Sequence, residues 1–76
     1  MARKKTAATQ AFGRAIREVR VERGFGQETF AAHAGIDRSY YGAIERGEFN
    51  VSLGTMVKLA AGLDVPVSEL LRRAQL

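Results

Sequence analysis

The sequence predicts an all-α fold, a compact domain of five short helices. Phe12, Ala15, Ile16 and Val19 follow the i, i+3, i+4, i+7 spacing of one buried helix face. Gly24, Gly35 and the break at Asp64-Val65-Pro66 separate segments of helical length. With 76 residues the chain forms one domain, and a core of this size supplies only about 3 to 5 kcal/mol of stability. Association of two copies would add to this stability.

The first helix is expected from about residue 9 to 23, where Gly24 ends it. Residues 1 to 8 contain Arg3, Lys4 and Lys5 among small residues and show no apolar period. We therefore expect a flexible basic arm over residues 1 to 8 and a folded domain over residues 9 to 76.

The central part of the chain, residues 27 to 46, predicts a helix, a sharp turn and a second helix. Helical spacing gives each of the two helices one inward side, formed by Gln27, Phe30, Ala31 and Ala34 in the first and by Ile36, Tyr41 and Ile44 in the second. Gly35 can adopt the left-handed conformation that the turn requires, and Asp37 is a favourable N-cap. We interpret the segment as a helix-turn-helix, although an α-hairpin of unspecified role fits the same features.

The outward side of the second helix suggests what the motif binds. If Tyr41 and Ile44 are buried, the side chains left for solvent are Arg38, Ser39, Gly42, Ala43 and Arg46. Two guanidinium groups with small residues between them suit the DNA major groove, where a helix reads base edges mainly with its N-terminal residues. These five residues are the predicted base contacts. The alternative for Arg38 is an ordinary surface arginine, and the basic arm either follows the DNA or is a solubilising tail.

The C-terminal part predicts two more helices. Ser52 should cap the fourth helix, whose expected inward residues are Leu53, Met56, Val57, Ala60 and Leu63. A fifth helix is expected from about Val67 to Ala74, after the break at Pro66. Its apolar side chains are too many for one small core to bury, and we expect a dimer interface formed by Val67, Leu70, Leu71 and Leu76. The alternative is that all four close the core of one chain.

The amino-acid composition argues against several classes of function. The net charge is +4, but Arg3, Lys4 and Lys5 supply three of these charges, so the distribution of the arginines matters more than the total. There is no cysteine, and His33 is the only histidine, so we expect no metal site, cofactor or catalytic centre. No apolar run is long enough for a membrane span or a signal sequence, and we expect a soluble, cytoplasmic protein without a small-molecule ligand.

Residues 12 to 71 resemble the XRE family, the lambda Cro and phage-repressor type of helix-turn-helix domain. The positions that carry this resemblance are Gln27, Ala31, Gly35, Ile44, the run Glu45-Arg46-Gly47, Asn50, Ser52-Leu53 and Leu59-Ala60. The resemblance implies a lambda repressor-like fold. The run Asp37-Arg38-Ser39-Tyr40, the loop from Asn50 to Leu53 and the small size are most similar to controller proteins of restriction-modification systems.

The resemblance also implies roles outside the recognition helix. Arg20 and Glu45 would form a structural ion pair that orients Arg20 toward the DNA backbone. The other backbone contacts that we expect are Gln27, Tyr40, Asn50 and Ser52. For Tyr40 the ring can cover the core while the hydroxyl reaches a phosphate or a base edge. Glu48 and Phe49 depart from the family, because many relatives carry a basic residue in this loop.

Together these features predict a transcriptional regulator that binds double-stranded DNA sequence-specifically. It would bind a pseudo-palindromic operator as a homodimer, and the narrower resemblance implies a controller of restriction-modification genes. The competing hypothesis is a protein-interaction module with a helix-turn-helix core, such as an antitoxin.

Overall fold

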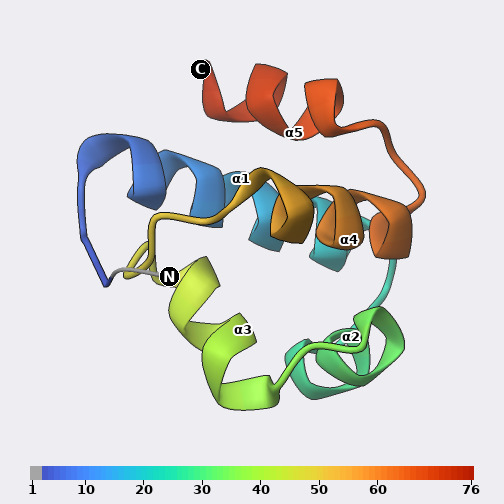
Figure 1. Ribbon diagram of the computed structural model, residues 1–76. Coiled ribbons are helices and arrows are strands. Elements are labelled where there is room, and N and C mark those ends of the chain that lie inside the picture. The colour runs from blue at the N-terminus through green and yellow to red at the C-terminus, as the bar shows by residue number, and fades with distance from the viewer. Residues whose placement is uncertain (1–2) are drawn as a thin grey trace.

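The computed structural model describes residues 3–76, which form five α-helices. The helices are α1 (Ala7–Glu22), α2 (Gln27–Ala34), α3 (Arg38–Glu45), α4 (Leu53–Leu63) and α5 (Val67–Ala74). Figure 1 shows α1 and α4 in the middle of the molecule, with α5 along one side and the α2–α3 pair along the other. The all-α prediction with five helices is confirmed.

Helix α1 begins earlier than the sequence pattern indicated, because Thr6 caps it. The Thr6 hydroxyl accepts a hydrogen bond from the Thr9 amide (3.1 Å), and Thr9 Oγ1 accepts one from the Thr6 amide (2.8 Å). This capping box satisfies amide groups that the first turn leaves free. The apolar period starts only at Phe12, so the pattern placed the helix start too late.

The N-terminal segment lies against the loop between α3 and α4, residues 46–52 (Figure 1). Arg3 and Phe49 form an isolated antiparallel bridge, and the Lys4 amide donates a hydrogen bond to the Glu48 carbonyl (2.8 Å). Residues 3 to 8 therefore belong to the folded domain, which corrects the prediction of a flexible arm over residues 1 to 8. Residues 1 and 2 lie outside the described part of the chain.

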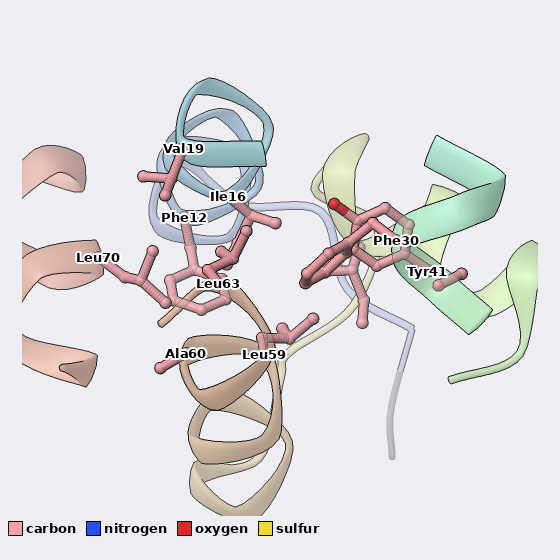
Figure 2. Close-up of a cluster of buried hydrophobic side chains, with 11 residues drawn as sticks. Phe12, Ile16, Val19, Phe30, Tyr41, Leu59, Ala60, Leu63 and Leu70 are labelled. Carbon is pink, nitrogen blue, oxygen red and sulfur yellow. The ribbon is translucent and has the colours of Figure 1, made fainter. Parts of the chain in front are cut away.

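The core joins side chains from all five helices (Figure 2). Its largest fully buried side chains are Tyr41, Phe30, Ile16, Ile44, Leu59, Leu63, Leu70 and Val19. The predicted inward positions Phe30, Tyr41 and Ile44 are therefore confirmed. They fix the rotation of α2 and α3, and this rotation determines which residues those helices present to solvent.

Helix α4 is rotated differently from the prediction. Leu53 and Val57 were expected to point inward, but they are 68% and 52% exposed, whereas Leu59 is fully buried. The buried side of α4 is formed by Leu59, Ala60 and Leu63, with Met56 half-buried beside them. Val57 follows Met56 directly and lies about 100° further around the helix, so it leaves the core. The prediction therefore included two exposed residues, Leu53 and Val57, and omitted Leu59, which is fully buried.

Helix α5 mainly packs against the core of its own chain. Leu70 is fully buried by its own chain, which corrects its assignment to a dimer interface. Val67 and Leu71 are half-buried and pack against the same core, and only Leu76 among the four predicted interface residues is exposed (61%). Leu70 therefore cannot contact a second copy, whereas the interface assignment of Val67, Leu71 and Leu76 stays a prediction.

Candidate nucleic-acid interface

Helices α2 and α3 form the predicted helix-turn-helix. Gly35 adopts the left-handed conformation (φ 71°), and the Ile36 amide donates to the Ala31 carbonyl (2.9 Å), so the turn closes α2. The Asp37 carboxylate accepts a hydrogen bond from the Tyr40 amide (3.0 Å) and caps α3. The turn chemistry predicted for Gly35 and Asp37 is confirmed.

The exposed side of α3 carries three of the five predicted base contacts. Arg38 and Ser39 lie at its N-terminal end and Arg46 follows its last residue, and all three are exposed. The Arg38 side chain is 63% exposed and only loosely paired, with its Nε 3.8 Å from Oε2 of Glu28. The Arg46 side chain is 59% exposed. Both guanidinium groups are therefore largely open to solvent, although Arg46 Nε donates a hydrogen bond to Oε2 of Glu48 (2.7 Å).

Gly42 and Ala43 are not on this exposed side. Both are buried, which corrects the prediction that they face solvent. A Cβ built on Gly42 would lie 3.3 Å from Arg46 Nη1 and 3.7 Å from Gln27 Oε1, so these side chains cover the glycine. The second half of α3 is enclosed because α2 and α1 both pack against it. In this arrangement the Arg46 and Gln27 side chains lie over Gly42.

Helix α1 approaches α3 at Gly13. A Cβ on Gly13 would lie 2.4 Å from the Ile44 carbonyl oxygen and 2.5 Å from that of Glu45. Real side-chain atoms do not approach this closely, so only glycine permits the contact. The close packing brings Arg20 of α1 within reach of Glu45.

A buried polar network lies beneath the exposed face. Arg20 donates from Nε to Oε2 of Glu45 (2.6 Å) and from Nη2 to Oε1 (3.1 Å), and its Nη1 donates to the Phe25 carbonyl (2.9 Å). Gln27 Nε2 also donates to Glu45 Oε1 (3.1 Å), and the Tyr41 hydroxyl donates to Oε2. The side chains of Arg20 and Glu45 are only 10% and 5% exposed. The predicted pair exists, and it holds Arg20 inside the domain as a positioning residue.

The carboxylate and guanidinium groups of this network stay ionised at neutral pH. Burial disfavours the ionised form of Glu45, but hydrogen bonds from Arg20, Tyr41 and Gln27 outweigh burial and hold the Glu45 pKa below its usual value. The bond to Glu45 raises the pKa of Arg20. Burial, and next the hydrogen bond to Glu45, raise the pKa of Tyr41 above its ordinary value. Glu45 is therefore a carboxylate at neutral pH, held by donors from α1, α2 and α3.

A hollow beside the network opens toward the exposed arginines. Its lining residues are Arg17, Arg20, Gln27, Glu45 and Arg46. Gln27 is the first residue of α2, where free amide groups and the helix dipole favour an anion. Arg17 was missed from the sequence, although its position one turn before Arg20 places it on the same side of α1. The hollow thus brings the exposed residues Arg17 and Arg46 beside the buried pair of Arg20 and Glu45.

The remaining predicted contacts lie around the α3–α4 loop. The Tyr40 ring is half-buried and packs edge-on against Phe49, with ring centroids 5.0 Å apart. Burial raises the pKa of the Tyr40 hydroxyl. Asn50 is exposed. Ser52 caps α4, because its hydroxyl accepts from the Thr55 amide (3.1 Å), and the predicted cap is confirmed. The Ser52 hydroxyl is engaged within the chain, and the Tyr40 hydroxyl also interacts with Thr55.

The described residues, 3–76, contain neither a cluster of metal ligands nor a membrane-crossing helix. This part of the chain contains no group of three or more histidine, cysteine, aspartate or glutamate residues that could hold a metal ion. It also contains no helix with both the length and the apolar character that crossing a membrane requires.

A helix-turn-helix that exposes two arginines over a buried ion-pair network defines a class of small DNA-binding domain. The family model described as helix-turn-helix matches residues 16–70. The chain belongs to the XRE-type helix-turn-helix family, as the resemblance predicted, and the predicted lambda repressor-like fold is confirmed.

Three similar proteins place the chain within this family. The control protein C.MunI of Mycoplasma sp is 45% identical over 60 residues, which cover 78% of this chain and 81% of that protein. The restriction-modification controller protein C.AhdI of Aeromonas hydrophila is 48% identical with a TM-score of 0.82, covering 86% of this chain and 98% of that one. The third is SinR, the master regulator for biofilm formation, in a crystal structure with DNA. It is 38% identical with a TM-score of 0.75, and the match covers 79% of this chain and 97% of that one.

Proposed function

We propose that this protein is a transcriptional regulator that binds double-stranded DNA sequence-specifically and inserts α3 into the major groove. The observation that carries the proposal is the exposure of Arg38, Ser39 and Arg46 on a helix whose other side is fixed by Tyr41 and Ile44. The proposed activity is binding without catalysis or a cofactor, in the cytoplasm. The exposed face and the family membership support it together.

We divide the proposed DNA contacts by the end of α3 near which they lie. Arg38 and Ser39 lie at the N-terminal end, which reads base edges in this mode of docking. Arg38 can donate two hydrogen bonds to a guanine. Arg46 was predicted as a base contact, but it lies at the opposite end beside Gln27 and Arg17. We therefore propose that these three side chains contact backbone phosphates. Tyr40 and Asn50 are further candidates for backbone contacts.

We also propose that the regulator is a homodimer on a pseudo-palindromic operator. Leu53 and Val57 lie one turn apart on α4 and are exposed, as is Leu76 at the C-terminal end of the chain. A second copy is the occupant that a two-fold operator requires, and it would bury this apolar surface. The two copies of α3 would then lie about 34 to 36 Å apart, which is one turn of DNA.

The genes under control are proposed to be those of a restriction-modification system. The similarity to C.MunI and C.AhdI extends over most of each chain, and their names describe them as control or controller proteins. This support comes from relatives, whereas the proposal of DNA binding also rests on the exposed side chains of α3.

A titration of fluorescent random duplex at two salt concentrations tests the proposed DNA binding. Neutralising phosphates with Arg17 and Arg46 releases counterions, so affinity should fall as salt rises, with a log–log slope of about −0.9 per phosphate neutralised. No binding, or binding independent of salt, would contradict the proposal. That result would favour the competing class, a protein-interaction module such as an antitoxin.

A further inference from the structure

The carboxylate of Glu48 lies between two exposed arginines from distant parts of the chain. Oε2 of Glu48 accepts a hydrogen bond from Arg46 Nε (2.7 Å), and Oε1 accepts one from Arg3 Nη1 (2.9 Å). The side chain of Glu48 is 22% exposed, whereas those of Arg3 and Arg46 are 69% and 59% exposed. The two guanidinium groups are therefore open to solvent on the side away from the carboxylate.

The backbone holds this arrangement in place. The Lys4 amide donates to the Glu48 carbonyl (2.8 Å), and Arg3 forms a bridge with Phe49. The Arg3 guanidinium also lies over the Phe49 ring, 4.8 Å from its centroid. The side chains that meet at Glu48 are thus positioned by main-chain pairing and ring packing as well as by attraction between their charges.

The chemistry of the arrangement is that of an anion site. Guanidinium groups bind carboxylate and phosphate with the same donors. The hydrogen bond from Arg46 holds the pKa of Glu48 below its usual value, and the charges of Arg46, Arg3 and Lys5 act in the same direction. Glu48 is therefore charged at neutral pH and neutralises part of a local excess of positive charge.

The position of the site connects it to the proposed DNA contacts. Arg46 follows the last residue of α3 and also lines the hollow that contains Gln27 and Arg17. A DNA backbone that passes this end of α3 would meet Arg46, and Arg3 is held on the other side of the same carboxylate.

We propose that Arg3 and Arg46 form a binding site for a backbone phosphate of duplex DNA, and that Glu48 occupies this site in the free protein. The proposal rests on the proposed DNA-binding function. A phosphate must compete with Glu48 for the two guanidinium groups, so Glu48 lowers affinity for every duplex alike. Recognition of bases by Arg38 is unaffected, and the occupancy of non-specific DNA falls.

The direct test is the variant Glu48→Gln, measured on random and on preferred duplex over a range of salt. Glutamine keeps the size of the side chain and removes its charge. We expect affinity to rise roughly 3- to 10-fold on both duplexes and the salt slope to steepen by about 0.9. Thermal unfolding of the variant checks that the domain remains folded.

The matched control is Glu22→Gln. Glu22 is also paired with an arginine, Arg73 of α5, and its replacement changes the net charge by the same amount. Figure 1 shows α5 on the side of the molecule opposite α3. We expect less than a twofold change for this variant, because charges separated by more than the Debye length of about 10 Å are screened.

A second variant tests whether Arg3 belongs to the proposed site. In the double variant Arg3→Ala with Glu48→Gln, part of the gained affinity should disappear. Unchanged or weaker binding by a folded Glu48→Gln protein would overturn the proposal, because Glu48 would then be a surface ion pair without effect on DNA. A gain confined to the preferred sequence, with an unchanged salt slope, would also overturn it. A wild-type protein that binds no duplex would contradict the proposed function itself.

Discussion

Glu45 is the residue on which the geometry of the exposed face depends most. It accepts hydrogen bonds from Arg20 of α1, Gln27 of α2 and Tyr41 of α3. All three donors are held by one carboxylate, so the network fixes the Gln27 side chain at the start of α2 relative to the arginines of α3. The sequence predicted the pair of Arg20 and Glu45 through the family resemblance. The Tyr41 hydroxyl was not predicted to join it, because the helical pattern indicated only that the ring is buried.

Replacing Glu45 by glutamine should destabilise the domain by about 3 to 5 kcal/mol at neutral pH, because Arg20 loses its charge partner inside the protein. The folded-state pKa of Glu45 lies below its unfolded value of about 4.3. The network therefore adds stability above that pH, and this contribution is lost as pH falls through the folded-state pKa. Urea unfolding at several pH values measures both effects.

The control for this variant is Glu18→Gln, a substitution at an exposed position of the same helix as Arg20. Glu22, Glu48 and Glu69 also have lowered pKa values, so wild-type stability falls in acid for several reasons. The difference between wild type and Glu45→Gln should nevertheless shrink toward low pH. A constant difference from neutral pH to pH 3 would show that the ionised carboxylate is not what stabilises the network.

Among the elements, the helix-turn-helix was the most predictable from sequence and α4 the least. Gly35 and Asp37 have local conformational requirements that any chain with this turn must meet. The rotation of α4 depends instead on which of its many apolar residues meet α1, α2 and α5. Leu53 and Val57 are as hydrophobic as Leu59, so composition alone does not separate the buried residues from the exposed ones. Burial of Gly42 likewise depends on the neighbours of α3.

The loop after α3 also contains a position that requires glycine, Gly47. Gly47 has a left-handed backbone (φ +76°), and a Cβ there would lie 2.5 Å from the Cα of Gln10. Gly47→Ala should therefore cost about 1 to 2 kcal/mol of conformational strain and about 1 to 3 kcal/mol of overpacking against α1. Urea unfolding at neutral pH measures the sum.

Gly24→Ala is the matched control for Gly47→Ala. Gly24 has nearly the same backbone conformation (φ +79°), but no atom lies within 4 Å of its would-be Cβ. This substitution should show the conformational strain alone. Equal losses of stability in the two variants would mean that the contact between the loop and α1 relaxes without cost.

At the scale of the whole molecule, the exposed apolar residues of α4 suggest how two copies associate. Val57→Asp should shift the protein toward a monomer in sedimentation at micromolar concentration, because a buried unpaired charge opposes association. Val21→Asp is the control, since Val21 is similarly exposed (59%) but lies on α1. A dimer that survives Val57→Asp, or a wild-type protein that is monomeric at these concentrations, would exclude the proposed surface.

The central claim is that the exposed face of α3 reads the sequence of duplex DNA. Selection of bound sequences from a random duplex pool, with wild type and Arg38→Ala in parallel, tests it most directly. Wild type should enrich two inverted half-sites whose centres lie about one helical turn apart. Arg38→Ala should lose about 1 to 3 kcal/mol on that site and relax selection at one base pair of each half. Failure to enrich any sequence, or an identical selected site for Arg38→Ala, would contradict the account.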